Sequence, residues 1–414
     1  MSLISLYNRD INLQYSSLNE TEGLCLTGVA IVNGTVVLNK NMQVLPCISG
    51  FLCHQQLNQR SSRTTSVTYG RNLLYCLSYL SSRDEFKHCR LDEAFLTVSR
   101  SVLEEYFSSL RIQGLKSSTI RNRDACIKSF FNDYLSKPVA GDYFRKDNPY
   151  GENGLISPSP KQRIVQPCEL YELEAMMRMS SSERERLLLQ FMFDSGVRRS
   201  EVGRVTLADI HESENFTRTV SWGRETKFDL PSGYLPLRIS GSKGRAGQIK
   251  PRITMLSAST FRRIKAYHSS PLYIQYARKY DHRRKPETTP AFFNSVGKPI
   301  NARTIDKLLL KLSNKAIASG AICKPISPHK LRHGYAYEVL KSKDLGDNYL
   351  DRLVNVSKTL GHSSIKITQD TYTRIPIDIY EKITERDSKA TSKSERMAML
   401  SKKTKVKIHI GDRK

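Results

Sequence analysis

Residues 139–165 constrain the fold more than any other part of the sequence. This stretch is rich in proline, glycine, asparagine and serine, and it lies between two parts of the chain that carry regular apolar patterns. Such a composition favours turns and irregular backbone. The two parts are therefore expected to build separate hydrophobic cores on either side of a flexible linker. A length of 414 residues agrees with this division, because a domain averages about 150 residues.

The first part predicts an all-helical unit over residues 45–138. Its apolar residues recur at i, i+3, i+4 and i+7, which is the spacing of one helix face. The clearest run consists of Leu103, Tyr106, Phe107 and Leu110. We expect about four helices in this unit.

The N-terminal residues 1–44 predict a small extension with a β-hairpin. Two stretches rich in β-branched residues flank Asn33-Gly34. An Asn-Gly pair is typical of a tight hairpin turn, because both residues tolerate a positive φ.

The second part, residues 166–382, alternates between helical and extended patterns. Helices are expected at residues 169–179, 182–194, 303–319, 330–340 and 348–359, and strands at residues 217–224 and 234–256. The second strand region has the pattern of a hairpin. The predicted fold class is mainly α with a small β-sheet: an all-helical domain followed by a mixed α+β domain.

The charge of the chain indicates a polyanionic partner. Lys and Arg number 66 against 40 Asp and Glu, which gives a net charge of +26, and a strongly basic balance favours nucleic-acid binding. No apolar run approaches the ~18 residues of a membrane span, and the N-terminus lacks a signal-peptide pattern. Eight scattered cysteines form no CxxC pair, as is usual in a reducing compartment. We therefore expect a cytoplasmic protein that does not bind membranes.

Residues 383–414 predict a basic C-terminal tail. From residue 386 onward, the chain has ten basic and three acidic residues. Two interpretations remain open, namely a disordered solubilising end and a segment that contacts DNA or a partner.

Two segments place a basic side chain next to a glycine turn. In DSGVRRSEV, an apolar helix ends before Gly196, and Arg198 follows the turn. In ISGSKGRAGQIKPRITML, Lys243 lies at the glycine-flanked tip of the expected hairpin. Each feature alone has a plain explanation, because a basic protein carries many surface arginines and many hairpin lysines.

Two later segments carry histidine, arginine and tyrosine. In SPHKLRHGYA, His329 and Arg332 are three residues apart, so a helix that begins there presents both on one face. In LGHSSIKITQDTYTRI, His362 precedes Tyr372 by ten residues. Taken singly, His329 could be a helix cap and Tyr372 a core residue.

Together and in this order, the segments GVRRSE, GSKG, HKLRH, LGHSS and TQDTY resemble the tyrosine recombinase (phage integrase) family. The resemblance covers residues 167–380 strongly and residues 45–138 more weakly, as a core-binding domain that precedes the catalytic domain. Tyr380 is the alternative nucleophile, and Arg245 and Lys250 are alternatives near the hairpin lysine. The resemblance implies six catalytic residues: Arg198, Lys243, His329, Arg332, His362 and Tyr372.

These residue types suit the displacement of a phosphodiester oxygen. Negative charge develops on the non-bridging oxygens, and the planar guanidiniums of Arg198 and Arg332 bind such oxygens in pairs. Tyr372 would attack the phosphorus and form a covalent 3′-phosphotyrosine link.

Proton transfers complete the expected reaction. A free phenol has a pKa of about 10, so Tyr372 needs a base, for which we expect His329. Lys243 would protonate the leaving oxygen as a general acid. His362 would contact the phosphate or orient the tyrosine. The covalent link conserves the bond energy, so we expect no ATP, no metal and no cofactor.

The resemblance also implies partners and an assembly. It predicts a C-shaped clamp on double-stranded DNA with inverted-repeat core sites, a homotetramer that exchanges C-terminal segments, and an accessory DNA-bending factor as an optional partner. A mobile element in a bacterial, nucleoid-associated setting is the expected context. The alternatives are a type IB topoisomerase-like or telomere-resolvase enzyme and a catalytically inactive DNA-binding regulator.

Overall fold

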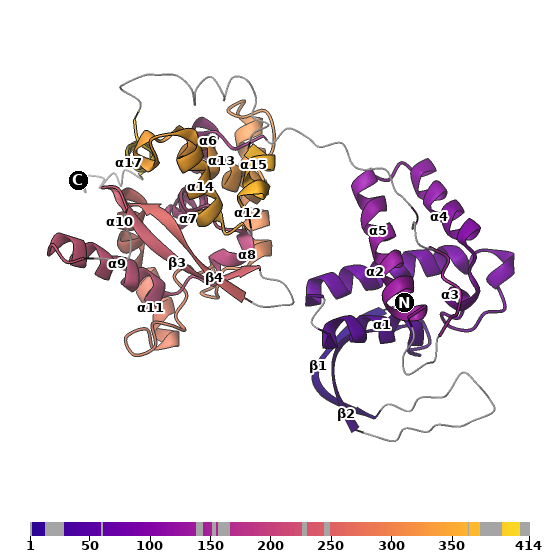
Figure 1. The fold of residues 1–414 in the computed structure, drawn as a ribbon. Helices are drawn as coiled ribbons and strands as arrows, with labels where there is room; N and C mark the ends of the chain where they lie inside the picture. The colour runs from indigo at the N-terminus through magenta and orange to yellow at the C-terminus, as the bar shows by residue number, and fades with distance from the viewer. Residues whose placement is uncertain are drawn as a thin grey trace. The chain divides into compact units, whose positions relative to one another are not determined.

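The computed structural model forms two compact units, which are considered separately (Figure 1). Residues 1–162 belong to the first unit, and residues 163–243 and 249–414 belong to the second. The structure describes residues 2–12, 29–58, 61–137, 144–150, 155, 166–225, 230–243, 249–362, 364–372 and 391–405.

The first unit begins with a two-stranded antiparallel sheet. Strand β1 (Ser2–Asn12) pairs with β2 (Val29–Leu38), and the register shifts between Leu6 and Arg9. The prediction that Asn33-Gly34 forms a hairpin turn is wrong, because both residues lie inside β2. The β-branched residues on either side of the pair continue one strand, and the partner strand comes from a segment more than twenty residues away.

Helices surround a single core in the first unit. They are α1 (Pro46–Leu57), α2 (Arg63–Leu80), α3 (Ala94–Thr97), α4 (Arg100–Ile112) and α5 (Ser117–Phe130), with short 3₁₀ and π turns at Asp84–Phe86 and Phe131–Leu135. The four longer α-helices match the predicted number. Leu103, Tyr106, Phe107 and Leu110 are all buried on one face of α4, as their spacing predicts.

The second unit is also mostly helical. Its first helices are α6 (Leu170–Arg178), α7 (Glu183–Ser195), α8 (Arg199–Val202) and α9 (Leu207–Ser221). The middle helices are α10 (Ala258–His268), α11 (Pro271–Ala277) and α12 (Ala302–Ala318), with a 3₁₀ turn at Arg278–Tyr280. The last are α13 (Pro328–Lys341), α14 (Tyr349–Leu360), α15 (Ile365–Tyr372) and α17 (Lys393–Thr404), with a 3₁₀ turn at Lys343–Leu345.

The predicted strand at residues 217–224 is wrong, because helix α9 continues to Ser221. The β-branched residues that suggested a strand are accommodated by side-chain bonds within the helix. The hydroxyls of Thr217 and Thr219 donate to the backbone carbonyls four residues earlier. Helix α9 packs along β3 and buries Ile210 and Ser213.

A second antiparallel sheet forms the predicted hairpin. Strand β3 (Tyr234–Lys243) pairs with β4 (Ile249–Ser257), with a shift in register between Ile239 and Ser242. Helix α9 packs on β3, while α7, α10 and α14 pack on β4 (Figure 1). The sheet therefore holds together elements that are distant in the sequence.

The predicted basic tail contains helix α17, which packs against α6, α7 and α10 of its own unit. Met397 and Leu400 are buried in the main core of this unit. The disordered interpretation is therefore wrong for Lys393–Thr404, while residues 406–414 lie outside the described residues. Among the helices that the structure describes, none has the length and apolar character that crossing a membrane requires.

Candidate active site

The turn that follows α7 presents Arg198. Gly196 adopts φ +62°, and a Cβ there would lie 2.5 Å from the Tyr335 ring and 2.8 Å from Leu360. Arg198 then forms the N-cap of α8, with its backbone N–H 2.8 Å from Oε2 of Glu201. Its Nη1 also donates to Oε1 of Glu201 at 2.8 Å. Glu201 thus fixes both the backbone and the guanidinium of Arg198.

Arg332 connects three helices at the same place. It lies on α13 and is buried, and its Nη1 and Nη2 donate to the carbonyl oxygens of Gly196 and Leu360. These carbonyls belong to the ends of α7 and α14. Burial and the neighbouring charges of Arg198 and Arg252 lower the pKa of Arg332 to about 9. Any negative charge that enters the site would relieve this repulsion.

Arg252 is a third arginine of the cluster, and the sequence analysis missed it. Its Nη2 lies 2.7 Å from Oε2 of Glu201, and its Nη1 donates to the carbonyl of Thr359. Burial would raise the pKa of Glu201, but the charges of Arg252 and Arg198 and a backbone N–H hold that pKa below its usual value. Glu201 therefore joins two arginines. A buried arginine in the alternating pattern of β4 is the signal that could have revealed it.

The histidines of α13 lie one helical turn apart. Ser327 caps the helix and Pro328 occupies its first position, so the HKLRH segment forms the first turns. His329 is exposed, and burial of part of its ring together with Arg332 and Arg199 lowers its pKa. The His333 ring centre lies 6.2 Å from that of His329. The sequence analysis quoted His333 within its motif but assigned it no role.

Tyr372 ends α15 with its side chain only 1% exposed. Its hydroxyl lies 3.0 Å from Nδ1 of His333, and its carbonyl accepts a bond from the hydroxyl of Tyr349 at 3.2 Å. Its ring makes edge contacts with His333 and Tyr337. Burial raises the pKa of the Tyr372 phenol, and the nearby charge of Arg332 only partly opposes this. The phenol is therefore neutral at physiological pH.

His362 follows the left-handed Gly361, which ends α14. Its Nδ1 lies 2.7 Å from the hydroxyl of Thr368 on α15. Burial, followed by the charges of Arg332 and Arg198, lowers the pKa of His362 to about 4. The ring is therefore neutral and held in a fixed orientation.

Lys243 is the last residue of β3, where its backbone pairs with Ile249. Its side chain and residues 244–248 lie outside what the structure describes. The hairpin lysine and its alternative Arg245 therefore stay predictions.

The second unit thus brings Arg198, Arg332, His362 and Tyr372 into one connected cluster. The ends of α7, α13, α14 and α15 meet there, and Arg332 influences the pKa of both His362 and Tyr372. His329 lies at its edge, near enough for Arg332 and Arg198 to lower its pKa. Such a cluster offers cationic donors beside a neutral phenol and neutral imidazoles, which suits an anionic ligand and nucleophilic attack.

The chain is similar to known proteins over most of its length. Residues 165–376, more than half of the chain, match the Phage integrase family. The tyrosine recombinase XerD of Halalkalibacterium halodurans is 25% identical over 337 residues, covering 80% of this chain and 92% of that protein. The tyrosine recombinase XerC of Pelotomaculum thermopropionicum is 25% identical over 346 residues, covering 81% and 95%.

Solved structures share the fold. The Tn1549 transposon integrase in complex with a circular intermediate DNA superposes with a TM-score of 0.52 at 14% identity, covering 82% of this chain and 98% of that chain. The XerH site-specific recombinase bound to a palindromic difH substrate gives 0.50 at 18% identity, covering 76% and 77%. The chain belongs to the phage integrase family and is a tyrosine recombinase, an enzyme that cleaves DNA strands and transfers them.

Proposed function

We propose that this protein is a site-specific DNA recombinase that cleaves and rejoins duplex DNA through a 3′-phosphotyrosine on Tyr372, without metal or ATP. The observation that carries the proposal is the position of Arg332. Its guanidinium bonds to the turn before Arg198 and to the end of α14 before His362. The buried guanidinium of Arg332 therefore fixes the backbone segments that precede Arg198 and His362, the other expected phosphate ligands.

The scissile phosphate would bind between the two arginines. A guanidinium has five N–H donors, and Arg332 uses two of them for the carbonyls of Gly196 and Leu360. The others would serve a non-bridging oxygen, with Arg198 on the second oxygen. Two such donors aimed at developing charge stabilise the transition state by several kcal/mol, roughly 10²–10³ in rate for each donor.

Proton transfer would use neutral imidazoles. His329 remains the expected base, and His333 is the imidazole that contacts the phenol in the structure. Each has a pKa below the ordinary value of a histidine, so each carries a lone pair at pH 7 that can accept the phenol proton. Lys243 is proposed to protonate the leaving 5′-oxygen, and His362 to donate to the phosphate.

Attack requires Tyr372 to leave its present position. A side chain that is 1% exposed cannot reach the phosphorus of a bound duplex. The bond between Tyr372 and His333 must therefore break as α15 moves. Cleavage and DNA binding are then separable steps of the proposed reaction.

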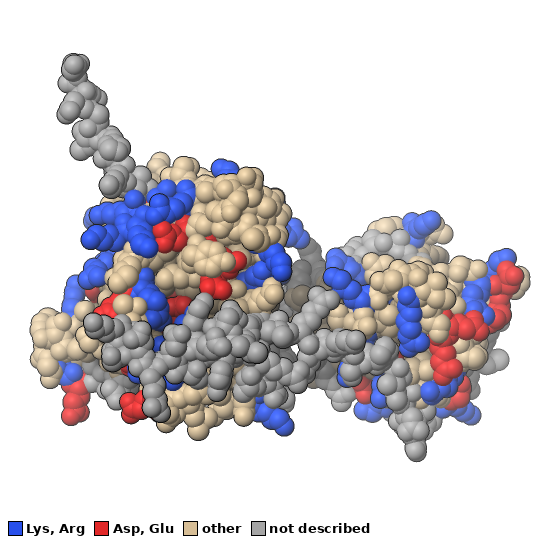
Figure 2. Space-filling model, turned by 90° about the horizontal axis from the view of Figure 1, so that it is seen from above, with Lys and Arg blue, Asp and Glu red and all other residues tan. Residues whose placement is uncertain are grey.

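Duplex DNA with inverted-repeat core sites is the proposed substrate. The net charge of +26 supports it, and Lys and Arg side chains gather in groups on the visible face of each unit (Figure 2). Contact with many phosphates makes affinity fall steeply with salt. The two units are proposed to close around the duplex as a C-shaped clamp.

A homotetramer is the proposed assembly on DNA. Helix α17 docks on its own unit and is joined to α15 only through residues 373–390. A second copy of the chain has the same docking surface for α17. We therefore propose that neighbouring copies exchange their α17 helices. A mobile element, an accessory DNA-bending factor and a bacterial nucleoid-associated setting are part of the proposal. Similarity to the Tn1549 transposon integrase supports the mobile element, and similarity to bacterial Xer recombinases supports the bacterial setting.

The test is covalent trapping on a nicked suicide substrate that carries candidate attachment sites. The expected result is a protein–DNA adduct that survives denaturation, with the modified peptide mapping to Tyr372. A purified chain that binds the site and forms no adduct would instead be a regulator. A two-site recombination assay beside a plasmid relaxation assay distinguishes a recombinase from a topoisomerase-like enzyme, which would only relax the plasmid.

A further inference from the structure

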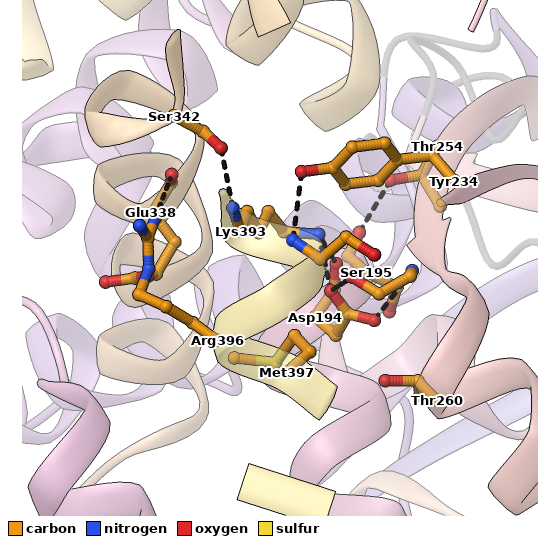
Figure 3. Close-up of polar contacts among 12 residues, drawn as sticks. Asp194, Ser195, Tyr234, Thr254, Thr260, Glu338, Ser342, Lys393, Arg396 and Met397 are labelled. Carbon is orange, nitrogen blue, oxygen red and sulfur yellow. Dashed lines mark hydrogen bonds and ion pairs between the residues drawn. The ribbon is translucent and has the colours of Figure 1, made fainter. Parts of the chain in front are cut away.

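A fully buried ion pair joins the C-terminal helix to the end of α7. Lys393 and Asp194 are both 0% exposed, and the Lys393 ammonium bonds to the Asp194 carboxylate and, at 2.9 Å, to the Asp194 backbone carbonyl. Figure 3 shows Lys393 extending from α17 toward Asp194. Two charges buried without water are costly unless they are paired and hydrogen-bonded, so this contact forms only when α17 is docked.

The surroundings of the pair leave little freedom for either residue. The backbone N–H and hydroxyl of Ser257 donate to the Asp194 carboxylate at 2.9 and 2.8 Å. The ammonium of Lys393 lies 5.4 Å from the ring centre of Tyr234 and 5.0 Å from that of Tyr335. The backbone N–H of Lys393 donates to Ser342 at 2.7 Å. The Lys393 ammonium thus anchors the first turn of α17 in the core, beside the bonds that Ser394 and Arg396 make to neighbouring elements.

Asp194 lies just before the turn that leads to Arg198. Ser195 follows it, and its carbonyl accepts the hydroxyl of Thr254 at 2.7 Å. Gly196 is next, and its carbonyl accepts Arg332. Arg198 comes two residues later. A displacement of Asp194 would therefore move the adjoining Gly196 turn, which leads to Arg198 and accepts a bond from Arg332.

Tyr335 provides a second connection. Its ring touches Lys393 on one side and lies so close to Gly196 that a Cβ there would be 2.5 Å away. Tyr335 is completely buried on α13, the helix of Arg332. The ammonium of α17 thus supports the Gly196 turn through both the backbone and an aromatic ring.

We propose that Lys393 is a positioning residue for DNA cleavage: a docked α17 neutralises Asp194 and thereby sets the Gly196 turn, which leads to Arg198 and whose carbonyl accepts a bond from Arg332. The inference rests on the proposed phosphotyrosine reaction. Without Lys393, the buried Asp194 carboxylate would keep only its two bonds from Ser257. We expect the carboxylate to shift toward other hydrogen-bond donors and to displace the adjoining Gly196 turn. A shift of about 1 Å at a reacting group can lower a rate by roughly 10²-fold.

The experiment measures the single-turnover cleavage rate on the suicide substrate at saturating DNA, with the DNA affinity measured separately. Lys393→Met removes the charge and keeps an unbranched side chain. We expect a cleavage rate about tenfold to 100-fold below wild type, with the dissociation constant for DNA within about twofold. If Lys393 had only a structural role, its loss would not lower the cleavage rate while leaving the DNA affinity unchanged.

Two variants on the same helix serve as matched controls. Lys402→Met removes an exposed charge and is expected to cleave at the wild-type rate. Ser401→Ala removes two hydrogen bonds between α17 and Gln190 without touching Asp194, and it is expected to lower the rate by less than about threefold. Equal losses from Ser401→Ala and Lys393→Met would overturn the proposal, since docking in general would then be the cause.

The double variant Asp194→Asn/Lys393→Met keeps the proposal testable even if Lys393→Met fails to fold. It removes both buried charges, so the turn is no longer drawn away, and its rate is expected to return to within about fivefold of wild type. A double variant as slow as Lys393→Met, or a Lys393→Met variant that cleaves normally, would overturn the proposal. A wild-type protein that forms no adduct would instead refute the phosphotyrosine reaction itself.

Discussion

The hydroxyl of Tyr372 lies 3.0 Å from Nδ1 of His333, although the two residues are 39 positions apart. Burial lowers the pKa of His333 to about 4 and raises that of the Tyr372 phenol. Both partners are therefore neutral at pH 7, and the bond joins an uncharged phenol to an uncharged imidazole. The proposed nucleophile is therefore held at rest by a hydrogen bond between two neutral groups.

Replacing Tyr372 with phenylalanine is expected to abolish the covalent adduct while leaving DNA affinity within about twofold, because the ring that fills the core is retained. The lost bond to His333 should lower the free energy of unfolding by about 1 kcal/mol. Denaturing gel electrophoresis after incubation with suicide substrate measures the adduct. Tyr380→Phe is the control and should cleave normally; an adduct from Tyr372→Phe would move the nucleophile elsewhere.

Acid is expected to destabilise the second unit through its buried histidines. His268, His333 and His362 have a pKa of about 4 in the folded protein, against about 6.5 in an unfolded chain. The unfolded chain therefore binds more protons between these values. The stabilisation is fully present above pH 6.5 and is lost as the pH falls toward 4.

The variant His333→Asn tests this pH dependence. An asparagine can keep a bond to the Tyr372 hydroxyl but does not titrate, so the loss of stability between pH 6.5 and 4 should be smaller than in wild type. Urea unfolding at several pH values measures it. His88→Asn changes an exposed histidine and should keep the wild-type profile. An unchanged acid response in His333→Asn would contradict the assignment.

Replacing Arg332 with lysine keeps the charge but loses the planar fork. One ammonium cannot serve the carbonyls of both Gly196 and Leu360 and a phosphate as well. We expect the single-turnover cleavage rate to fall by roughly 10²–10³. Arg199→Lys is the matched control, because Arg199 is 53% exposed and pairs with Asp306 at the surface. Comparable rates for Arg332→Lys and Arg199→Lys would argue against a phosphate role for Arg332.

Replacing Gly196 with alanine is expected to disturb both stability and catalysis. The φ of +62° costs an L-residue about 1–2 kcal/mol, and the added Cβ would meet Tyr335 and Leu360, at a further cost of about 1–3 kcal/mol.

Gly320→Ala separates these two effects. Gly320 also has a positive φ, +71°, but a Cβ there meets nothing within 4 Å. Thermal unfolding should show a small loss for Gly320→Ala and a larger one for Gly196→Ala, with only the latter lowering the cleavage rate. Equal losses would mean that packing at the turn is unimportant.

Local patterns predicted α6, α7, α12, α13 and α14, because helix caps and apolar spacing are properties of short segments, but they did not predict α10 or α11. Helix α14 is an example: Asn348 and Asp351 form a capping box at its start and Gly361 ends it. The same local reasoning failed at residues 217–224, where β-branched residues favoured a strand but packing against β3 stabilised a helix.

Contacts between distant residues could not be read from the sequence. The pairing of β1 with β2 and the ion pair of Asp194 with Lys393 depend on the folded backbone, not on any spacing. The motifs did locate the turn of Arg198, the helix of Arg332 and the segment of Tyr372, whose catalytic roles stay predictions. His333 and Arg252 carry no separate motif, and their contacts depend on the folded structure.

The docking of α17 against the core of its unit also limits how the protein can be shortened for laboratory use. A gene that stops after Tyr372 would encode all six residues proposed to contact the scissile phosphate or transfer its protons. It would nevertheless omit Met397 and Leu400 from the core and deprive Asp194 of its ammonium. The truncated polypeptide would expose the apolar surface that α17 covers and would leave the Asp194 carboxylate without its ion-pair partner. We therefore expect it to precipitate during purification, although its catalytic motifs are complete.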